Sequence, residues 1–475
     1  MAPGPRPAAV AAGHRGTAGA AAAVLRLGGN AFDAAVAAGC AAAVVEPCLT
    51  SLAGGGFLTA RTAAGEEVVV DFFVAVPGLR AEARHDPGGL VRVPIHFGAA
   101  VQDFHVGPAS VAVPGVLAGY LHVHERWGRL PLDQVVAPAV ELAGRGVVVD
   151  EHLARLTSLL APVFERTVAG RELFFRDDRP LTTGDRFDNP ALAEFLNDVG
   201  AGSRRGFTQG ELGGQVTAAD LGRYRVEERD PLRVARGGAE LLINPAPSFG
   251  GRLVAHALER LAGSPRPFSA DEPASVVDLA EALVAMAEHR RSLGPGNSRG
   301  TTHISICDGE GNHVAMTTSN GSGSGEFAAG LGVQLNNMMG EEDLHPDGFG
   351  AMEPGSRIGS MMAPAVLRSA GRHVVLGSGG SERIRSVITQ LVLRLVDSGE
   401  EPEPAVLAPR LHWDGASLQA EPGWPEPVLA ALGRRWPVNR WDRPDLYFGG
   451  AHVVSSDGHA VGDPRRGGAG IVIEP

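Results

Sequence analysis

The clearest alternation of polar and apolar positions along the chain falls at residues 303–307. The polar, glycine-containing run 308–312 follows, and a second strand-like run covers 314–320. A period of two is typical of a half-buried strand, and the intervening run has turn chemistry. The pattern therefore predicts a β-hairpin, with residues 300–302 at its entrance.

Hydrophobic spacing elsewhere predicts a mixed α and β chain, with a loop over 80–110. Thr17 is the expected cap of the first helix, and Gly28-Gly29 its end. The main helical patterns cover 17–27, 31–46, 115–126, 132–144, 272–291 and 383–396, and segment 245–251 leads into a further helix that ends near 261. Strands are expected at 57–60, 68–73, 365–367 and 373–376.

The segment 293–300, which precedes the hairpin, is rich in glycine and proline and suits an exposed loop where a chain is cut. Cleavage before Thr301 would place a hydroxyl and a free α-amine on one residue. Such an amine has a pKa of about 7.7–8.0 and can act as a base near neutral pH. Without cleavage, Thr301-Thr302 is simply the β-branched start of a strand.

A second glycine-rich turn, 377–381, lies between a predicted strand and a predicted helix. Gly379 and Gly380 suit an oxyanion hole, because no side chain blocks approach to their backbone. A phosphate cradle and an ordinary helix-entry turn are the competing interpretations. Residues 296–300 match G-x-S-x-G around Ser298, but the flanking patterns lack the strand and helix that this motif requires.

The amino-acid composition excludes several classes of partner and of catalytic chemistry. The chain has 475 residues and a net charge of −12, which disfavours nucleic acid and anionic membranes as partners. It contains no lysine, which excludes a Schiff-base lysine, a pyridoxal phosphate anchor and a P-loop lysine. Its three cysteines and scattered histidines form no metal-ligand spacing. We expect no metal and no cofactor.

The start of the chain has no charged and apolar pattern typical of a signal peptide. The most apolar stretch, 18–45, is interrupted by Arg26, Asn30 and Asp33, so two buried helices are expected and not a membrane span. A cytoplasmic location is the resulting expectation.

Several short motifs, in one order along the chain, resemble the γ-glutamyltransferase family of N-terminal nucleophile hydrolases. The cleavage-site motif is Gly300-Thr301-Thr302-His303, followed by Asp308 and Gly311-Asn312. The other matching segments are 28–35, 54–57, 113–115, 247–251, 335–337, 360–364 and 377–381. Each motif is weak alone, but the ordered set covers almost the whole chain and is specific.

The resemblance implies an α+β fold, the four-layer αββα sandwich of this superfamily. It also implies autocatalytic cleavage between Gly300 and Thr301. The products would be a large subunit, 1–300, and a small subunit, 301–475, which remain together as one αββα unit. The sequence does not fix whether the chain forms homo-oligomers.

The resemblance also assigns roles. Thr301 would attack a small-molecule amide or γ-glutamyl-like substrate, Gly379 and Gly380 would hold the oxyanion, and Ser319 would support the nucleophile's hydroxyl. Positions that would contact the substrate are Phe73, Asn320, Met338, Glu341, Ser360 and Met361.

Departures from the family pattern concern the acyl group. Phe73 stands where the family has an arginine that binds the substrate carboxylate, and Gly359-Ser360 keeps one of two serines. A bidentate charged contact and an apolar one are not interchangeable. We therefore expect an amide-cleaving threonine hydrolase or acyltransferase whose acyl group is less polar than glutamate at its α-carbon.

Other interpretations remain open. The same scaffold would suit an amidohydrolase, an acylase or a carbon–carbon bond hydrolase of specialised metabolism. The chain would otherwise be an unprocessed, non-catalytic homologue that binds a metabolite. A serine hydrolase acting through Ser298 is a third option.

Overall fold

A computed structural model describes most of the chain. The described residues are 6–79, 89–97, 100–213, 216–263, 266–292, 300–341, 344–345, 348–369 and 371–475. Segment 293–299, including Ser298, lies outside them, whereas the Gly300–Thr301 pair lies inside.

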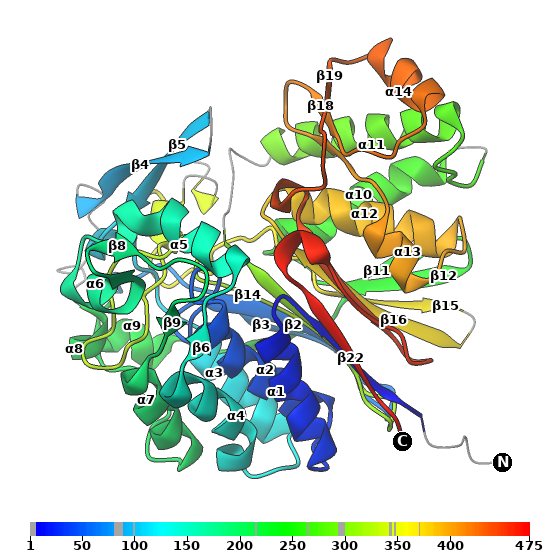
Figure 1. Ribbon diagram of the computed structural model, residues 1–475. Helices are drawn as coiled ribbons and strands as arrows, with labels where there is room; N and C mark the ends of the chain where they lie inside the picture. Colours follow the sequence, from blue (N-terminus) through cyan, green and yellow to red (C-terminus); the bar gives the residue numbers. More distant parts are fainter. Residues whose placement is uncertain are drawn as a thin grey trace.

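The predicted hairpin forms the middle of a seven-stranded sheet. β13 (Thr302–Cys307) pairs with β14 (His313–Ser319) so that Thr302 faces Thr318 across the two strands. In order across the sheet, the strands are β10 (Glu227–Arg229), β3 (Glu67–Phe72), β2 (Gly55–Arg61), β14 (His313–Ser319), β13 (Thr302–Cys307), β1 (Ala8–Ala12) and β22 (Ala469–Ile473). The first and last strands of the chain, β1 and β22, lie side by side (Figure 1).

A six-stranded sheet packs face to face against the first. Its order is β11 (Leu232–Arg236), β12 (Ala239–Ile243), β15 (Ala365–Ser369), β16 (Arg372–Gly379), β20 (Gly450–Ser455) and β21 (Ala460–Gly462). Small side chains such as Ala11 and Ala315 of the first sheet meet Val366 and Val375 of the second in one buried cluster. Close approach of the sheets follows from these small residues.

Helices cover the two outer faces, on opposite sides of the paired sheets (Figure 1). The first sheet carries α1 (Arg15–Arg26), α2 (Ala31–Val45), α3 (Val116–Trp127), α4 (Leu132–Arg145) and α7 (Pro190–Gly200). The second carries α10 (Phe249–Ala262), α11 (Pro273–Ser292) and α12 (Arg383–Val396). All fifteen residues of α2 are buried, which explains its continuous run of alanine and valine.

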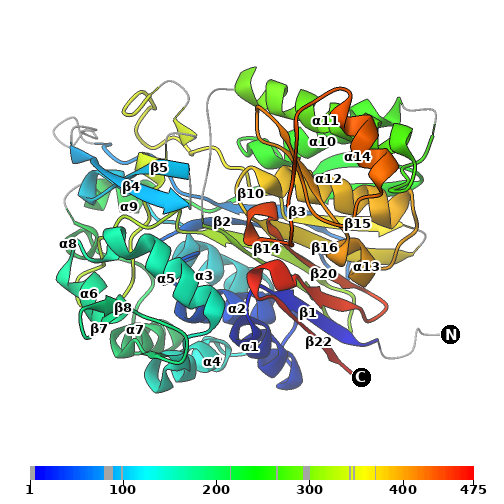
Figure 2. The same cartoon turned by 45° about the horizontal axis from the view of Figure 1, so that its top comes forward.

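The expected loop over 80–110 is wrong for its second half. β4 (Val91–Phe97) and β5 (Ala100–Val106) form a hairpin that lies beside α5 (Glu151–Phe164) (Figure 2). Apolar side chains of the hairpin and of α5 share one buried cluster. A proline in β4 and the isolation of this hairpin from both large sheets weakened the sequence signal. The first part of that range, 80–88, is outside the described residues.

The expected cap at Thr17 is also wrong. His14 caps α1 by accepting the Gly16 N–H at its Nδ1, 2.9 Å away. The Thr17 hydroxyl donates instead to Glu46 Oε1 at 2.6 Å.

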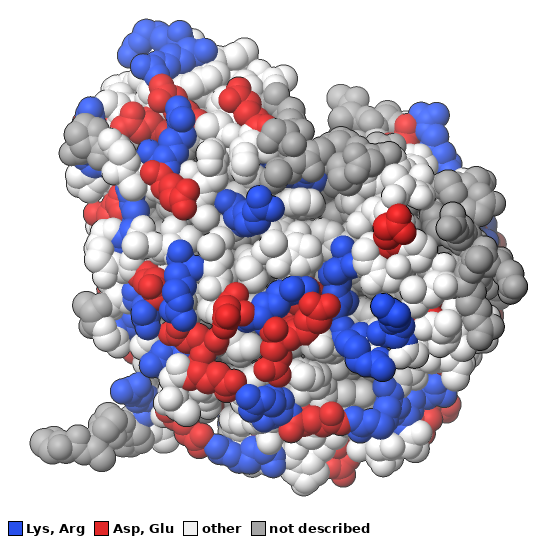
Figure 3. Space-filling view, turned by 180° about the vertical axis from the view of Figure 1, so that it is seen from behind, with Lys and Arg blue, Asp and Glu red and all other residues white. Residues whose placement is uncertain are grey.

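Shorter elements complete the fold: β6 (Val147–Val148), α6 (Val168–Phe174), β7 (Phe175–Arg176), β8 (Arg179–Pro180), β9 (Arg186–Phe187), α8 (Gln209–Leu212), α9 (Ala218–Arg223), α13 (Pro402–Leu407), β17 (Leu411–Trp413), β18 (Leu418–Ala420), α14 (Glu426–Gly433) and β19 (Val438–Arg440). Across the described ranges, no helix combines the length and apolar character needed to cross a membrane. Acidic and arginine side chains are interspersed on the face shown in Figure 3.

Histidines are buried between the two sheets. The rings of His303 and His452 lie parallel, with centroids 6.5 Å apart. His303 is held by Thr317 Oγ1 at 2.7 Å and Ser305 Oγ at 2.9 Å, and a Cβ on Gly377 would lie 2.2 Å from its ring. His303 is therefore a packing residue of the inter-sheet layer.

Acid should destabilise the fold through these rings. Burial lowers the pKa of His452 from 6.5 to about 4, so its contribution to stability is present above pH 6.5 and lost as the pH falls toward 4. Full protonation would cost about 3 kcal/mol at roughly 1.4 kcal/mol per pKa unit. We expect His452→Asn to lose less stability than wild type between pH 7 and about 4, measured by urea unfolding. An exposed control, His459→Asn, should follow wild type, and equal losses in all three proteins would contradict the assignment.

Candidate active site

Thr301 lies immediately before β13, at the end of the central strand, and is 2% exposed. The residue before it must be glycine. Gly300 has φ +61°, and a Cβ on it would lie 2.1 Å from the Gly321 carbonyl oxygen. Both the left-handed backbone and the close approach exclude larger residues. The Gly300–Thr301 peptide is therefore held in one tightly packed geometry.

Ser319 acts on the peptide carbonyl of Gly300. Its hydroxyl donates a short hydrogen bond to that oxygen and accepts the Gly321 N–H at 2.9 Å. The sequence reasoning expected this hydroxyl to support the Thr301 side chain. The structure places it on the carbonyl that precedes Thr301, which is the group where negative charge would develop if that peptide were attacked.

The Gly379–Gly380 turn meets Thr301 from the second sheet. Gly379 ends β16, and a Cβ on it would lie 2.2 Å from the Thr301 carbonyl oxygen. Gly380 follows with φ +120°, and α12 begins three residues later at Arg383. The structure thus brings the expected nucleophile and the expected oxyanion turn into contact, although 78 positions separate Thr301 and Gly379 in the sequence.

Arg466 lies beside the same turn and was not anticipated from the sequence. A Cβ on Gly380 would lie 3.1 Å from its Nη2. Two of its donors, Nε and Nη2, bind the Leu446 carbonyl at 3.3 and 3.1 Å. Burial, followed by the nearby Arg383 cation, lowers the pKa of Arg466 to about 10. The guanidinium stays charged and adds positive potential beside the glycine pair.

Phe73 belongs to an apolar cluster with Met338, as the loss of the arginine suggested. Its ring stacks on Phe57 with centroids 5.6 Å apart. Other members of the cluster include Val76, Met339, Ile358 and Met362. Two hydrogen bonds hold the backbone of Phe73 in place. Its carbonyl accepts one from Tyr224 Oη at 2.7 Å and one from Arg357 Nη1 at 2.5 Å.

Met361 does not share this environment. Its side chain lies in the core of the second sheet, and Met362 takes the place in the Phe73 cluster. The expectation that Met361 contacts substrate stays a prediction. Ser360 is 3% exposed, and its carbonyl accepts the Phe249 N–H at 2.7 Å.

Asn320 and Glu341 lie next to Ser319 and Gly321. Asn320 is fully buried and donates from Nδ2 to Gln334 Oε1 at 3.0 Å. Glu341 Oε1 accepts the Ser322 hydroxyl at 3.3 Å and would lie 3.1 Å from a Cβ on Gly321. The buried Glu341 carboxylate thus lies next to Gly321, whose carbonyl oxygen is close to Gly300.

Glu46 is a further residue that sequence reasoning missed. Its two oxygens accept the hydroxyls of Thr302 and Thr17, each at 2.6 Å, so it ties the residue after Thr301 to α1. Burial raises the pKa of Glu46. Glu46 lines a small cavity, with room for about one water molecule, together with His14, His152 and Arg466. The only sequence signal was an acidic residue directly before Pro47 at the end of an apolar helix.

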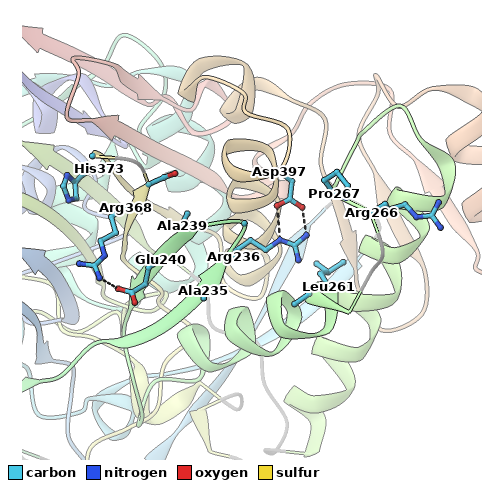
Figure 4. A pocket seen from close by; sticks show the side chains of 15 residues that line it. Ala235, Arg236, Ala239, Glu240, Leu261, Arg266, Pro267, Arg368, His373 and Asp397 are labelled. Carbon is cyan, nitrogen blue, oxygen red and sulfur yellow. Dashed lines mark hydrogen bonds and ion pairs between the residues drawn. The ribbon is translucent and has the colours of Figure 1, made fainter.

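A wide pocket of about 920 Å³ lies elsewhere and does not serve this site. It is lined by residues of the β11–β12 turn and the β15–β16 turn, at the end of the second sheet that is far from Gly379 (Figure 4). His373 of its lining and Gly379 are six residues apart on β16, roughly 20 Å along a strand. Two of its cations are paired, Arg236 with Asp397 and Arg368 with Glu240.

No group of three metal-ligating side chains is found within the described ranges.

The sequence profile described as Gamma-glutamyltranspeptidase matches residues 17–298 and 294–473. The chain belongs to the γ-glutamyltranspeptidase family. It is an enzyme of the γ-glutamyltransferase-like, N-terminal nucleophile hydrolase class, as the ordered motifs predicted.

Its relatives include proteins named as acylases and proteins named as glutathione hydrolases. The Acylase ACY 1 proenzyme of Pseudomonas sp. (strain V22) is 31% identical, over 95% of this chain and 93% of the relative. The Glutathione hydrolase proenzyme of Escherichia coli (strain K12) is 27% identical, over 86% and 82%. The crystal structure of cephalosporin acylase from Bacillus halodurans has a TM-score of 0.83 at 23% identity, over 98% and 96% of the two chains, and shows the shared fold.

The Thr301–Gly379 contact gives a direct structural test. Gly379→Ala should lower the free energy of unfolding by about 1–3 kcal/mol, because the new methyl group meets backbone that cannot move aside. Gly433→Ala, where a Cβ meets nothing within 4 Å, is the matched control and should be neutral or stabilising. Urea unfolding measures both, and equal stability of the two variants would refute the close approach.

Proposed function

We propose that the chain cleaves itself between Gly300 and Thr301 and that Thr301 then opens amides through an acyl-enzyme. The observation that carries the proposal is the Ser319 hydroxyl bound to the Gly300 carbonyl, beside Thr301 and against Gly379. The names of two relatives as proenzymes support it.

Self-cleavage begins with attack of Thr301 Oγ1 on the Gly300 carbonyl carbon. The C–N bond to Thr301 breaks, which leaves an ester to the hydroxyl and a free α-amine. Ser319 stabilises the oxyanion during this step, since its O–H already donates to that oxygen. Water then hydrolyses the ester, releasing the Gly300 carboxylate and the Thr301 hydroxyl.

The freed residue then acts on substrate. The Thr301 amine takes the proton of its own hydroxyl, Oγ1 attacks the substrate carbonyl, and the amine product leaves with that proton. Gly379 and Gly380 are the proposed oxyanion hole, next to the Arg466 cation. The acyl group then passes to water or to an amine. We propose a large subunit, 1–300, and a small subunit, 301–475, within a four-layer αββα unit.

The acyl pocket is proposed to be less polar than that of a γ-glutamyl enzyme. Phe73 lies in a buried cluster with Met338 and Phe57, and the hydrogen bond from Tyr224 to its carbonyl holds its backbone in place. That the 31% identical relative is named an acylase, and not a glutathione hydrolase, supports this proposal.

The first test is the mass of the purified chain. Wild type should give two fragments split after Gly300, and Thr301→Ala should stay intact. Ser319→Ala should cut about a hundredfold more slowly, as expected for loss of an oxyanion donor, while Ser319→Thr should keep most of the rate. A wild-type chain that stays whole and inactive would instead support a non-catalytic, metabolite-binding homologue.

The second test compares the hydrolysis of a pentanoyl anilide and a γ-glutamyl anilide by the processed enzyme. We expect wild type to hydrolyse the pentanoyl anilide faster. Phe73→Arg should shift the ratio of kcat/KM toward γ-glutamyl by about tenfold or more, the value of one charged hydrogen bond. Phe73→Leu is the packing control and should keep the wild-type preference. Preference of wild type for the γ-glutamyl anilide would refute the apolar pocket.

A further inference from the structure

Glu46, at the end of α2, is a buried carboxyl group beside the proposed cleavage site. It is 6% exposed, and its two oxygens accept the hydroxyls of Thr302 and Thr17, each at 2.6 Å. Distances of about 2.5–2.7 Å are typical of a hydroxyl that donates to a charged carboxylate. Both hydrogen-bond partners are neutral groups, so they do not balance the negative charge that they stabilise.

The residues after Glu46 run past the peptide to be cut. A Cβ on Gly300 would lie 3.3 Å from the Cys48 carbonyl oxygen. The Leu49 carbonyl accepts the Asn320 N–H at 3.2 Å. The turn that follows α2 is therefore packed against the proposed cleavage site.

A glycine on the other side leaves room for the bond between Glu46 and Thr302. A Cβ on Gly13 would lie 2.4 Å from Glu46 Oε2 and 2.7 Å from Thr302 Oγ1. Thr302 directly follows Thr301, and the Cα atoms of consecutive residues are about 3.8 Å apart. The bond to Thr302 thus holds the carboxylate near the backbone nitrogen of Thr301.

The proposed cleavage would change the charge at this nitrogen. The uncut peptide is neutral, whereas the freed amine of Thr301 becomes an ammonium ion when it takes the hydroxyl proton. Thr301 is 2% exposed, and a buried cation is costly unless an opposite charge lies nearby. Burial raises the pKa of Glu46, and its two hydroxyl partners lower it. An ammonium beside it would lower that pKa further, so the two groups would be charged together.

Other charged and titratable groups face this pair. Around Glu46 they are His14, Tyr120, Asp150, His152 and Arg466, and around Thr301 they are Arg466, Glu341 and the carboxylate that cleavage would leave on Gly300. Arg466 is a cation and would oppose the ammonium. Asp150 lies 3.4 Å from His14 Nε2, so its charge is directed to that ring. Glu46 is the carboxylate bonded to the residue next to Thr301.

We propose that Glu46 is a positioning residue that stabilises the ammonium form of the Thr301 amine through its bond to Thr302. The inference rests on the proposed function and adds the group that strengthens its base. A carboxylate near an amine favours the protonated amine. Transfer of the Thr301 hydroxyl proton to the amine therefore becomes more favourable.

The absence of lysine makes this amine directly measurable. After cleavage the chain carries two aliphatic amines, one on its first residue and one on Thr301. Formaldehyde with cyanoborohydride methylates neutral amines, so the pH dependence of labelling, read by peptide mass spectrometry, gives the pKa of each. Glu46→Gln should lower the pKa of the Thr301 amine by about one unit or more, the effect of removing a nearby opposite charge. The amine of the first residue is the internal control and should not change.

The variants separate charge from packing. Glutamine has the shape of glutamate and can keep both hydrogen bonds, so Glu46→Gln removes the charge alone. Asp150→Asn removes a carboxylate from the same cavity and keeps the cap of α5, so it should leave the Thr301 amine unchanged. Thr302→Val breaks the link and should lower the pKa of the amine in the same direction. In Glu46→Gln, the acid limb of kcat/KM for the pentanoyl anilide should move to lower pH by the same amount.

Each outcome has one meaning. The same amine pKa in wild type and Glu46→Gln would overturn the role of Glu46 and leave self-cleavage intact. A wild-type chain with no amine on Thr301 would refute the cleavage itself, and the role of Glu46 with it. If Glu46→Gln stays uncut, Thr302→Val decides in its place. If both stay uncut, the proposal is overturned, because Glu46 would then act before the amine exists.

Discussion

The close packing of the Thr301 carbonyl against Gly379 is the constraint on which the site depends. It joins the central strand of one sheet to the end of β16 in the other, so two strands far apart in sequence fix one peptide. Ser319 and Gly321 hold the preceding peptide, the one between Gly300 and Thr301. Small residues at these points are required because the backbones themselves touch, and any added methyl group would separate nucleophile and oxyanion turn.

Much of this arrangement was predictable from local pattern. The alternation over 303–307 and the turn after it predict β13 and β14, and the glycine-rich turn before 383–396 predicts the start of α12. The pairing of these elements came from the ordered family motifs and not from periodicity. The β4–β5 hairpin was missed, because its strands contact neither large sheet and their pattern is interrupted by Pro94.

The residues that periodicity could not find act through tertiary contacts. In the sequence, Glu46 is only the last residue of an apolar helical pattern. In the structure it lies at the end of α2 and binds Thr302 of β13 and Thr17 of α1. Arg466 is one of many arginines, and only its burial beside the Gly379–Gly380 turn distinguishes it. Ser319 was found as a hydroxyl near the nucleophile, but its true partner, the Gly300 carbonyl, depends on the left-handed backbone of Gly300.

Trapping the acyl-enzyme tests the central claim most directly. A slowly hydrolysed amide would be mixed with processed enzyme, quenched in acid and mapped by peptide mass spectrometry. The account predicts that the acyl mass is found on the peptide that begins with Thr301, attached to its hydroxyl. Acyl mass on Ser298, or on a peptide that does not begin at Thr301, would contradict it.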